Sequence, residues 1–346
     1  MSTTAPREPG QRSAVEAPLA AAPPLAVGSV LAPRRLVWVA AGGVLLVALL
    51  AAPWVLTGYW VRVLTSVFMF AALAQSLNLI AGFTGYADFG NVLYFGIGAY
   101  ATGFLMQQQV PAVLAIAVGA VLAAALAGAL GLPILRLKGH SFAIATIGVM
   151  EATRELVTNM QFLGGGAGLN VPIIRLPPQQ FSLLIYFAML ALAVAYTVLV
   201  YVLARSALGY GLRAIKADEA AAAVMGIPTT LFKTLAWMLS AAGSAIVGGV
   251  YAIWVGFIEP SVAFSVVTST EYFIMMLLGG PGTVLGPVLG AVILQLLATL
   301  IWSQFLHGHL AMLGVAIVLI VLFLPNGLVP ALRRGGKGGG RPGSAR

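Results

Sequence analysis

The chain is dominated by apolar segments of about 20 residues, which is the length that an α-helix needs to cross the hydrocarbon core of a bilayer. Charged residues make up 8% of the 346 residues and apolar residues 60%, whereas soluble domains average about 25% and roughly 45–50%. We therefore predict an all-α, polytopic transmembrane helix bundle. The expected spans are 36–56, 60–80, 87–107, 111–135, 140–158, 181–204, 233–255, 262–280, 283–302 and 309–328.

Lysine and arginine are distributed unevenly between the two ends of these spans. Ten crossings place both termini on one side, and all but three of the 18 Lys and Arg residues then lie on that side. The exceptions are Arg62, Arg154 and Arg175. Since the cytoplasmic ends of membrane spans carry the excess of basic residues, we expect both termini in the cytoplasm. The net charge of +9 then reflects orientation in the membrane, not nucleic-acid binding.

Composition and motifs divide the chain and exclude several functions. Residues 1–33 are rich in Ala and Pro and predict a disordered cytoplasmic tail, residues 34–332 hold the transmembrane domain, and residues 333–346 form a basic, flexible C-terminal tail. The chain has no cysteine and no phosphate-binding, metalloprotease or hydrolase motif. His307 and His309 have no third ligand nearby. We expect no catalytic residue, no metal site and no cofactor bound by this chain.

The longest polar interruption is the loop 205–233, which the charge distribution assigns to the cytoplasm. A short helix is predicted inside it, because Asp218 and Glu219 suit a first helical turn, an alanine run follows, and Gly226 and Pro228 stop it. The acidic pair either stabilises the helix dipole or meets basic groups on a partner.

This short helix is expected to need a partner surface. A helix of about two turns is marginal alone in water, and Ala221, Val224 and Met225 would present an apolar face. We therefore interpret the helix as a docking element.

Polar residues inside the apolar segments mark a candidate translocation path, because such residues are costly in a membrane unless they face a cavity or a partner. Asp88 and Asn91 lie in a glycine-rich stretch, and Gln75 and Asn78 lie just upstream. The glycines of 82–98 permit a broken or re-entrant helix. Under the alternative interpretation, they only permit close packing, and Asp88 sits at a helix end.

Two further segments carry polar or small residues. Glu271 is a weaker path candidate, because the neighbouring residues 268–270 could satisfy it structurally. Gly282, Gly286 and Gly290 recur every four residues, which predicts one tightly packed helix face. Near an outer end, Arg154 is expected to form a local ion pair with its glutamate neighbours Glu151 and Glu155.

Several motifs, in their order and spacing, resemble those of LivM-type permease subunits of branched-chain amino acid ABC importers. The resemblance covers about residues 60–332. The motifs are GFTGYADFGNVLYFGIGAY (82–100), LKGHSFAIATIGVMEATREL (137–156), GGGAGL (164–169), GYGLRAIKADEAAAAVMGI (209–227), FIEPSVAFSV (257–266), STEYFIMMLLGGPGTVLGPVLGA (269–291) and LFLPNGLVP (322–330).

The resemblance implies a bacterial inner-membrane importer. Its partners would be two cytoplasmic ABC ATPases that bind ATP and magnesium, a LivH-like second permease, a periplasmic substrate-binding protein and membrane lipid. The loop 205–233 would hold the coupling helix that docks on the ATPase, as in the E-A-A…G loop of ABC importers. The coupling residues would be Arg213, Asp218, Glu219, Ala220, Ala221, Val224, Met225 and Gly226.

The match has two departures and leaves alternatives open. The spacing from Glu219 to Gly226 is one residue longer than in the commonest motif, and Asn91 stands where many relatives have His. The outer loop 159–180 either receives the binding protein or only connects two spans. Related permeases serve urea, amides or aromatic acids. An ion-coupled secondary transporter, a membrane enzyme and a monosaccharide-type ABC permease are less consistent with the motifs.

Overall fold

The computed structural model describes residues 33–137 and 139–304, and the chain divides into two units, residues 1–49 and 50–346. In the first unit, the described residues belong to helix α1 (Pro33–Val55). Both predicted tails apart from Pro33, the predicted span 309–328, the LFLPNGLVP motif, and His307 and His309 lie outside the described residues.

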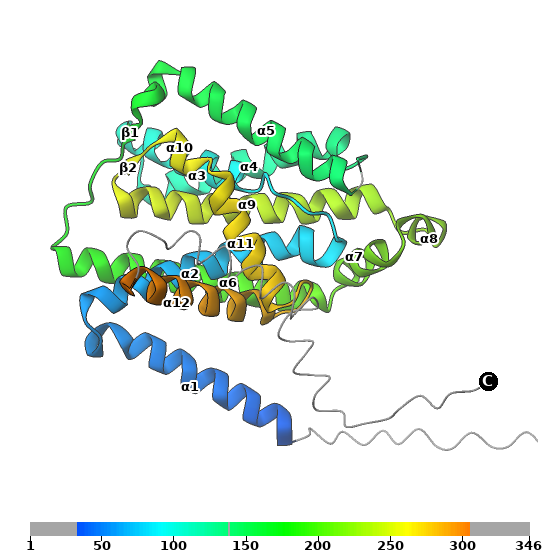
Figure 1. Ribbon diagram of the computed structural model, residues 1–346, viewed down its shortest axis with the longest axis horizontal. Helices are drawn as coiled ribbons and strands as arrows, with labels where there is room; N and C mark the ends of the chain where they lie inside the picture. The colour runs from blue at the N-terminus through cyan, green and yellow to red at the C-terminus, as the bar shows by residue number, and fades with distance from the viewer. Residues whose placement is uncertain (1–32, 138, 305–346) are drawn as a thin grey trace, which may run out of the picture. The chain divides into compact units, whose positions relative to one another are not determined.

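The second unit is built almost entirely from helices, as predicted (Figure 1). Two short 3-10 turns and one antiparallel pair of two-residue strands, which pairs Leu169 with Ile258, interrupt them. Its elements are α2 (Gly58–Leu77), the π-helical turn η1 (Asn78–Gly82), α3 (Val92–Gln107), α4 (Ala112–Ile134), α5 (His140–Asn159), η2 (Gln161–Leu163), η3 (Gly165–Ala167), β1 (Leu169–Asn170), α6 (Pro178–Ala204), α7 (Ala207–Ala217), α8 (Glu219–Val224), α9 (Thr229–Val255), β2 (Phe257–Ile258), α10 (Pro260–Ala263), α11 (Val266–Gly279) and α12 (Gly286–Gln304).

Within the described residues, five helical segments are long and apolar enough to cross a membrane. α5 is not among them, because it carries Glu151, Arg154 and Glu155. α3 and the apolar part of α12 are shorter. The protein is therefore multi-pass, and the total of ten spans stays a prediction. The five segments are Gly58–Gly82, Ala112–Ile134, Pro178–Ala204, Thr229–Val255 and Pro260–Gly279.

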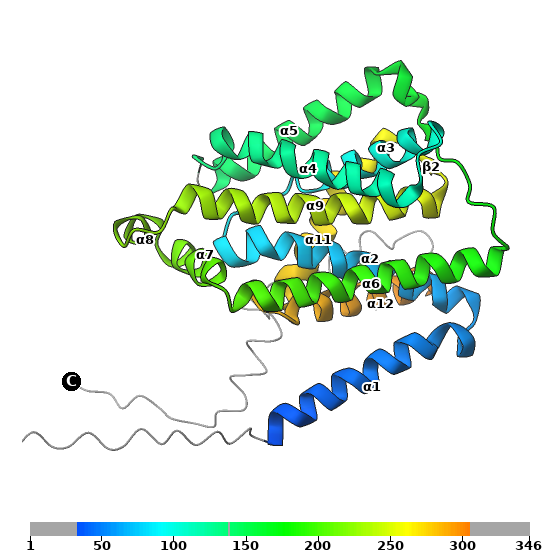
Figure 2. The ribbon, with the colours of Figure 1, turned by 180° about the vertical axis from the view of Figure 1, so that it is seen from behind.

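Helix α9 lies at the centre of the second unit and packs against α2, α3 and α4, while α2 and α6 lie side by side (Figure 2). Two glycines bring the backbones of α3 and α9 together. A Cβ on Gly98 would overlap the backbone of Ala245, and a Cβ on Gly248 would overlap the backbone of Phe95. This close approach places the chain that precedes α3 against the side of α9.

The glycine-rich stretch is a broken helix. α2 continues through η1, and the chain is then mostly non-helical until α3 begins at Val92. Gly82 lies at this break, where a Cβ would collide with Asn78 Oδ1 and with the backbone nitrogen of Gly282. We call residues 83–91 the linker segment.

The prediction of one helix face carrying Gly282, Gly286 and Gly290 is wrong. Gly282 has φ +78° in a turn that precedes α12, and Gly286 is the first residue of that helix. Only Gly290 lies inside the helix, where a Cβ would overlap the carbonyl oxygen of Met275 on α11. The four-residue spacing does not mark one helix face here, because Gly282 lies in the turn and the helix begins only at Gly286.

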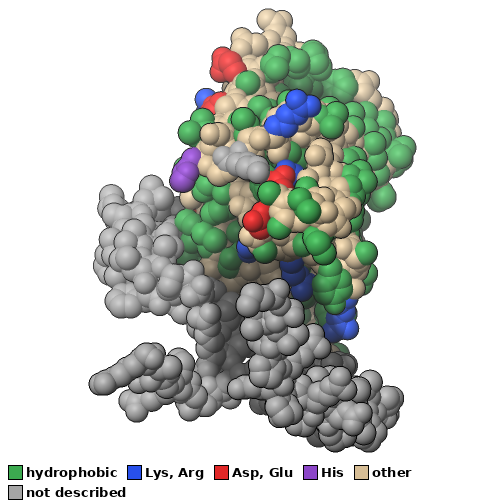
Figure 3. All heavy atoms as spheres, turned by 90° about the vertical axis from the view of Figure 1, so that its right-hand side faces the viewer, with side chains coloured by type: hydrophobic (Ala, Val, Ile, Leu, Met, Phe, Trp, Pro, Cys, Tyr) green, Lys and Arg blue, Asp and Glu red, His purple; other side chains and the backbone are tan. Residues whose placement is uncertain are grey.

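Lysine and arginine residues of the described part of the second unit lie toward its two ends. One end, which we call the α8 end, holds α7, α8, the start of α9 and the last turns of α4 and α6, together with Arg136, Arg205, Arg213 and Lys216. Figure 3 looks onto this end, where acidic and basic side chains lie among apolar ones. Arg62 lies in the first two turns of α2, Arg154 in the second half of α5 and Arg175 in the chain between β1 and α6. These parts of the chain lie at the end away from α8 (Figure 1).

Candidate functional site

Helix α8 forms as the sequence predicts. Asp218 is its N-cap, and its side chain accepts hydrogen bonds from the backbone N–H groups of Ala220 (2.8 Å) and Ala221 (3.1 Å). This satisfies two of the backbone donors that a helix leaves free at its start. After the helix, Gly226 adopts φ +82°, a left-handed conformation that favours glycine. Both ends of α8 are therefore fixed by the local sequence.

One side of α8 is apolar and exposed. The side chains of Val224 and Met225 are 88% and 81% exposed, and Ala221 is exposed as well. Ala222 is the buried residue of this helix. In Figure 1, α8 lies at the edge of the unit, away from the packed helices. The three apolar residues predicted to form a docking face are thus on the surface.

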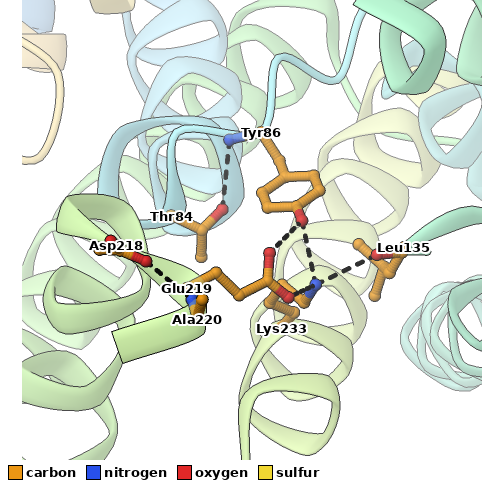
Figure 4. Close-up of polar contacts among 7 residues, drawn as sticks. All are labelled: Thr84, Tyr86, Leu135, Asp218, Glu219, Ala220 and Lys233. Atoms are coloured by element: carbon orange, nitrogen blue, oxygen red, sulfur yellow. Dashed lines mark hydrogen bonds and ion pairs between the residues drawn. The ribbon is translucent and has the colours of Figure 1, made fainter. Parts of the chain in front are cut away.

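The carboxylate of Glu219 is turned toward the protein and is only 20% exposed. Its Oε1 accepts from Lys233 Nζ at 2.6 Å, and its Oε2 accepts from the hydroxyl of Tyr86 at 2.8 Å. Figure 4 shows these side chains converging from α8, α9 and the linker segment. The two acidic residues therefore have different roles. The side chain of Asp218 caps the start of α8, whereas that of Glu219 bonds to Lys233 and Tyr86 in other parts of the chain.

Lys233 is almost completely buried, with 2% of its surface exposed. Besides Glu219, its ammonium group donates to the Tyr86 hydroxyl at 3.0 Å and to the carbonyl oxygen of Leu135 at 3.1 Å (Figure 4). A lysine ammonium has three N–H donors, and each finds an acceptor here. Because an unpaired buried charge is strongly unfavourable, Lys233 fixes the positions of α8, the linker segment and the end of α4. We call Tyr86, Glu219 and Lys233 the latch.

Helix α7 makes two more contacts with the region around the break. The guanidinium of Arg213 lies 5.5 Å from the ring centre of Phe83 and also donates to the carbonyl oxygen of Ala204. Lys216 Nζ donates to the carbonyl oxygen of Gly82 at 2.7 Å. Partial burial lowers the pKa of Lys216 below its usual range. The α7–α8 segment therefore contacts the chain at Gly82, Phe83 and Tyr86.

Deeper in the protein, the linker segment enters a buried polar network. Asp88 Oδ2 accepts from Trp237 Nε1 at 2.8 Å and from Asn91 Nδ2 at 3.3 Å. Asn91 Nδ2 also donates to Ser240 Oγ at 3.1 Å, and Asn91 Oδ1 accepts from Ser244 Oγ at 2.5 Å. Asp88 and Asn91 have no exposed surface. The sequence predicts that Asp88 and Asn91 act in one region. In the structure they bond to each other and to Trp237, Ser240 and Ser244 of α9.

Gln75 and Asn78 hold the turn before α12. Asn78 Nδ2 donates to the carbonyl oxygen of Thr283 at 2.9 Å, and Asn78 Oδ1 accepts from the backbone N–H of Gly282 at 2.8 Å. Gln75 Nε2 donates to the carbonyl oxygen of Val284 at 2.5 Å. Both side chains are buried within this subunit. They support the neighbourhood of the linker segment and do not join the network of Asp88 and Asn91.

Glu271 lies on α11 and is partly buried. Two of the three neighbours expected to satisfy it bond elsewhere. Ser269 donates to the Tyr272 hydroxyl at 3.2 Å, and Thr270 donates to the carbonyl oxygen of Val266 at 2.9 Å. Tyr272 in turn donates to Asn91 Oδ1 at 3.5 Å. Within residues 33–137 and 139–304, no hydrogen bond joins Ser269 or Thr270 to Glu271.

The local ion pair predicted near Arg154 is confirmed. Arg154 and Glu151 are 2.8 Å apart, while Glu155 accepts from Asn159 within the same helix. Among the described residues, no group of three or more His, Asp or Glu side chains could hold a metal ion.

Sequence reasoning missed helix α7 and the partners of Glu219 and Asp88. α7 is signalled by the spacing of Leu208, Leu212 and Ile215 after the N-cap Ser206. Lys233 carries a weaker signal, because it lies five residues into an apolar helix and must find acceptors there. Nothing local marks Tyr86 or Trp237 as partners.

Comparison with known proteins identifies the family of the chain. The family described as branched-chain amino acid transport system / permease component matches residues 59–324. The chain is 28% identical over 317 residues to the high-affinity branched-chain amino acid transport system permease protein LivM of Salmonella typhimurium, which covers 84% of this chain and 74% of the relative. The Escherichia coli protein of the same description is 27% identical over the same shares.

A more distant relative is the probable branched-chain amino acid transport permease protein LivM of Methanocaldococcus jannaschii. It is 24% identical over 319 residues, which cover 76% of this chain and 90% of the relative. No solved structure matches the chain.

Proposed function

This chain belongs to the family of branched-chain amino acid transport permease components, and from that premise we propose that it is the LivM-type permease subunit of an ABC importer for branched-chain amino acids. The similarity to LivM permeases over 84% of the chain supports the transport role. The apolar helices supply the membrane-spanning body. Urea, amides and aromatic acids remain alternative substrates within the same mechanism.

The proposed assembly contains the partners that the resemblance to LivM-type permeases implies. Two cytoplasmic ATPases would hold ATP and magnesium, a LivH-like chain would complete the permease pair, and a periplasmic binding protein would deliver the substrate. We place the complex in the bacterial inner membrane with ten spans and both termini in the cytoplasm. The separation of basic residues between the two ends of the second unit supports this orientation.

The observation that carries the proposed mechanism is the exposed apolar face of α8 at the α8 end. The exposed side chains of Val224 and Met225 adjoin that of Ala221, and contiguous exposed apolar residues are typical of interaction sites. We propose that this face docks on the ATPase, with Ala221 beside it and with Asp218, Ala220 and Gly226 fixing its geometry. Arg213 and Glu219 would join α8 to the membrane body. Closure of the ATPase pair would then switch the pore between outward and inward access.

Reconstitution into vesicles tests the proposed function. We expect branched-chain amino acid uptake only when this chain, its partner permease, the ATPases, the binding protein and ATP are all present. Uptake by this chain alone, driven by an ion gradient and independent of ATP, would instead identify a secondary transporter. The ligand that raises the melting temperature of the cognate binding protein separates branched-chain amino acids from urea, amides and aromatic acids.

We further propose that Gln75, Asn78, Asp88, Asn91 and Glu271 line or support the translocation path. Asp88 and Asn91 would act through the buried network, because neither is exposed within the subunit. Gln75 and Asn78 would support the path through the turn before α12. Glu271 is partly exposed and is the member of this group that could face the second permease.

Replacing Asp88 by asparagine is expected to lower uptake roughly tenfold without loss of assembled complex. The amide can still accept from Trp237, but the charge that strengthens this hydrogen bond is gone, and such bonds are worth about 1.5–3 kcal/mol. Uptake per assembled complex is the measurement. Thr102→Val is the matched control, because Thr102 is equally buried and its hydroxyl has no hydrogen-bond partner among the described residues. Wild-type uptake by Asp88→Asn across pH would assign Asp88 a packing role.

A further inference from the structure

The linker segment runs inward along one side of α9. Tyr86 contacts Lys233, Asp88 contacts Trp237, and Asn91 contacts Ser240. These α9 residues follow one another at spacings of four and three, so they lie on one face of the helix. The linker is therefore a continuous connection from the α8 end to the buried network, held to α9 at each turn.

The α7–α8 segment contacts the start of the linker segment and the adjoining Gly82 at three points. Arg213 contacts Phe83, Lys216 contacts the carbonyl oxygen of Gly82, and Glu219 contacts Tyr86. The three residues are spaced by three along the chain, and the last belongs to α8 itself. A displacement of α8 must therefore either pull on Tyr86 or break its hydrogen bond to Glu219.

Breaking that contact is costly because Lys233 is buried. If Glu219 moved away alone, the Lys233 ammonium would keep only two neutral acceptors at a site that is 2% exposed. Movement of α8 together with Tyr86 and the ammonium group at the end of the Lys233 side chain keeps the hydrogen bonds among the three latch residues. The chemistry of the site thus favours joint movement over separation.

We propose that the latch of Tyr86, Glu219 and Lys233 transmits the movement of α8 through the linker segment to the network of Asp88 and Asn91. This inference rests on the proposed function, in which α8 receives the force of the ATPases. The three latch residues are positioning residues, because they act through the linker and do not contact the substrate. Packing contacts alone would leave α8 free to move without the linker.

A thiol probe in the linker tests this proposal in the complete transporter. The chain contains no cysteine, so Ala87→Cys introduces its only thiol, at a half-buried position between Tyr86 and Asp88. We expect the rate at which a thiol reagent modifies this chain to change at least threefold when ATP is added. We expect Tyr86→Phe or Glu219→Gln to remove that change and to lower uptake per ATP hydrolysed about tenfold.

Tyr210→Phe is the matched control. It removes a hydroxyl from an exposed tyrosine at the same end of the protein and keeps the ring beside Arg213. Its probe response and its uptake per ATP should equal those of the wild type. Tyr86→Phe likewise keeps the ring contact with Phe142, which limits the disturbance to the latch.

The outcomes separate this inference from the proposed function. The inference fails if Tyr86→Phe and Glu219→Gln reduce only the amount of assembled complex. In that case each remaining complex keeps the ATP-dependent probe response and the wild-type uptake per ATP, and the latch only stabilises the protein. If the unmodified transporter shows no ATP-driven uptake at all, the proposed function fails instead.

Discussion

Replacing Val224 and Met225 together by aspartate is expected to abolish co-purification of the ATPase and to reduce ATP-driven uptake to background. Both side chains are exposed, so the change leaves the packing of α8 on α7 and α9 intact. In the proposed complex they enter an apolar cleft, where burial of each contributes about 1.5–3 kcal/mol. Loss of both lowers the affinity at least a hundredfold, and two buried carboxylates lower it further.

The control for this double variant is Phe162→Asp. Phe162 is also apolar and exposed, at 64%, but it lies in η2 at the opposite end of the unit. Phe162→Asp should leave co-purification of the ATPase unchanged. If the variant at Val224 and Met225 assembles in the membrane and still retains the ATPase, the exposed face of α8 is not the docking surface.

Gly226 provides a second variant for the same prediction. A Cβ at Gly226 meets no atom within 4 Å, so any defect comes from the backbone conformation at φ +82°. A non-glycine residue costs about 1–2 kcal/mol in this conformation, and asparagine is better tolerated there than a β-branched residue. Gly226→Val should therefore displace Met225 and weaken ATPase binding, while Gly226→Asn should retain most of it.

Replacing Gly98 by alanine is expected to destabilise the protein by about 1–3 kcal/mol or more, the usual cost of overpacking. The added methyl group would overlap the backbone of Ala245, which cannot move aside without separating α3 from α9. The apparent melting temperature of the purified protein should fall by about 2–4 °C for each kcal/mol lost. Uptake should fall with it, because the linker segment loses its support on α9.

Gly148→Ala is the matched control for Gly98→Ala. Gly148 is also helical, but nothing lies within 4 Å of an added Cβ. Alanine stabilises an open helical position by roughly 0.5–1 kcal/mol relative to glycine. The two substitutions should therefore shift the melting temperature in opposite directions. Equal effects would mean that α3 and α9 do not pack through Gly98.

Much of the fold follows from local patterns in the sequence. Apolar stretches of helical length predicted the helical bundle. The acidic pair Asp218 and Glu219 predicted the start of α8 and Gly226 predicted its end, although Asp218 is the N-cap and not a residue of the first turn. The Arg154–Glu151 pair was predictable because residues three apart on a helix are neighbours. In each case the deciding interaction lies within one element or beside it.

The latch could not be predicted, because its members come from three separate segments. Tyr86 and Lys233 are 147 residues apart, and Tyr86 and Glu219 are 133 apart. Their meeting depends on how α9 packs against its neighbours, which no local pattern encodes. The partner of Asn78 could not be predicted for the same reason. The sequence makes Asn78 a candidate for the translocation path, but its side chain bonds to a turn 204 residues later.

The linker segment also constrains how the chain is made. Buried polar side chains need hydrogen-bond partners, and those of this segment find partners on α9 and α11, which follow 149 to 181 residues later in the chain. The segment from α2 to α3 is therefore expected to remain without its final polar contacts until α9 has been synthesised. Truncation of the chain before α9 is therefore expected to leave Asp88 and Asn91 without their α9 partners and the earlier helices more sensitive to proteolysis.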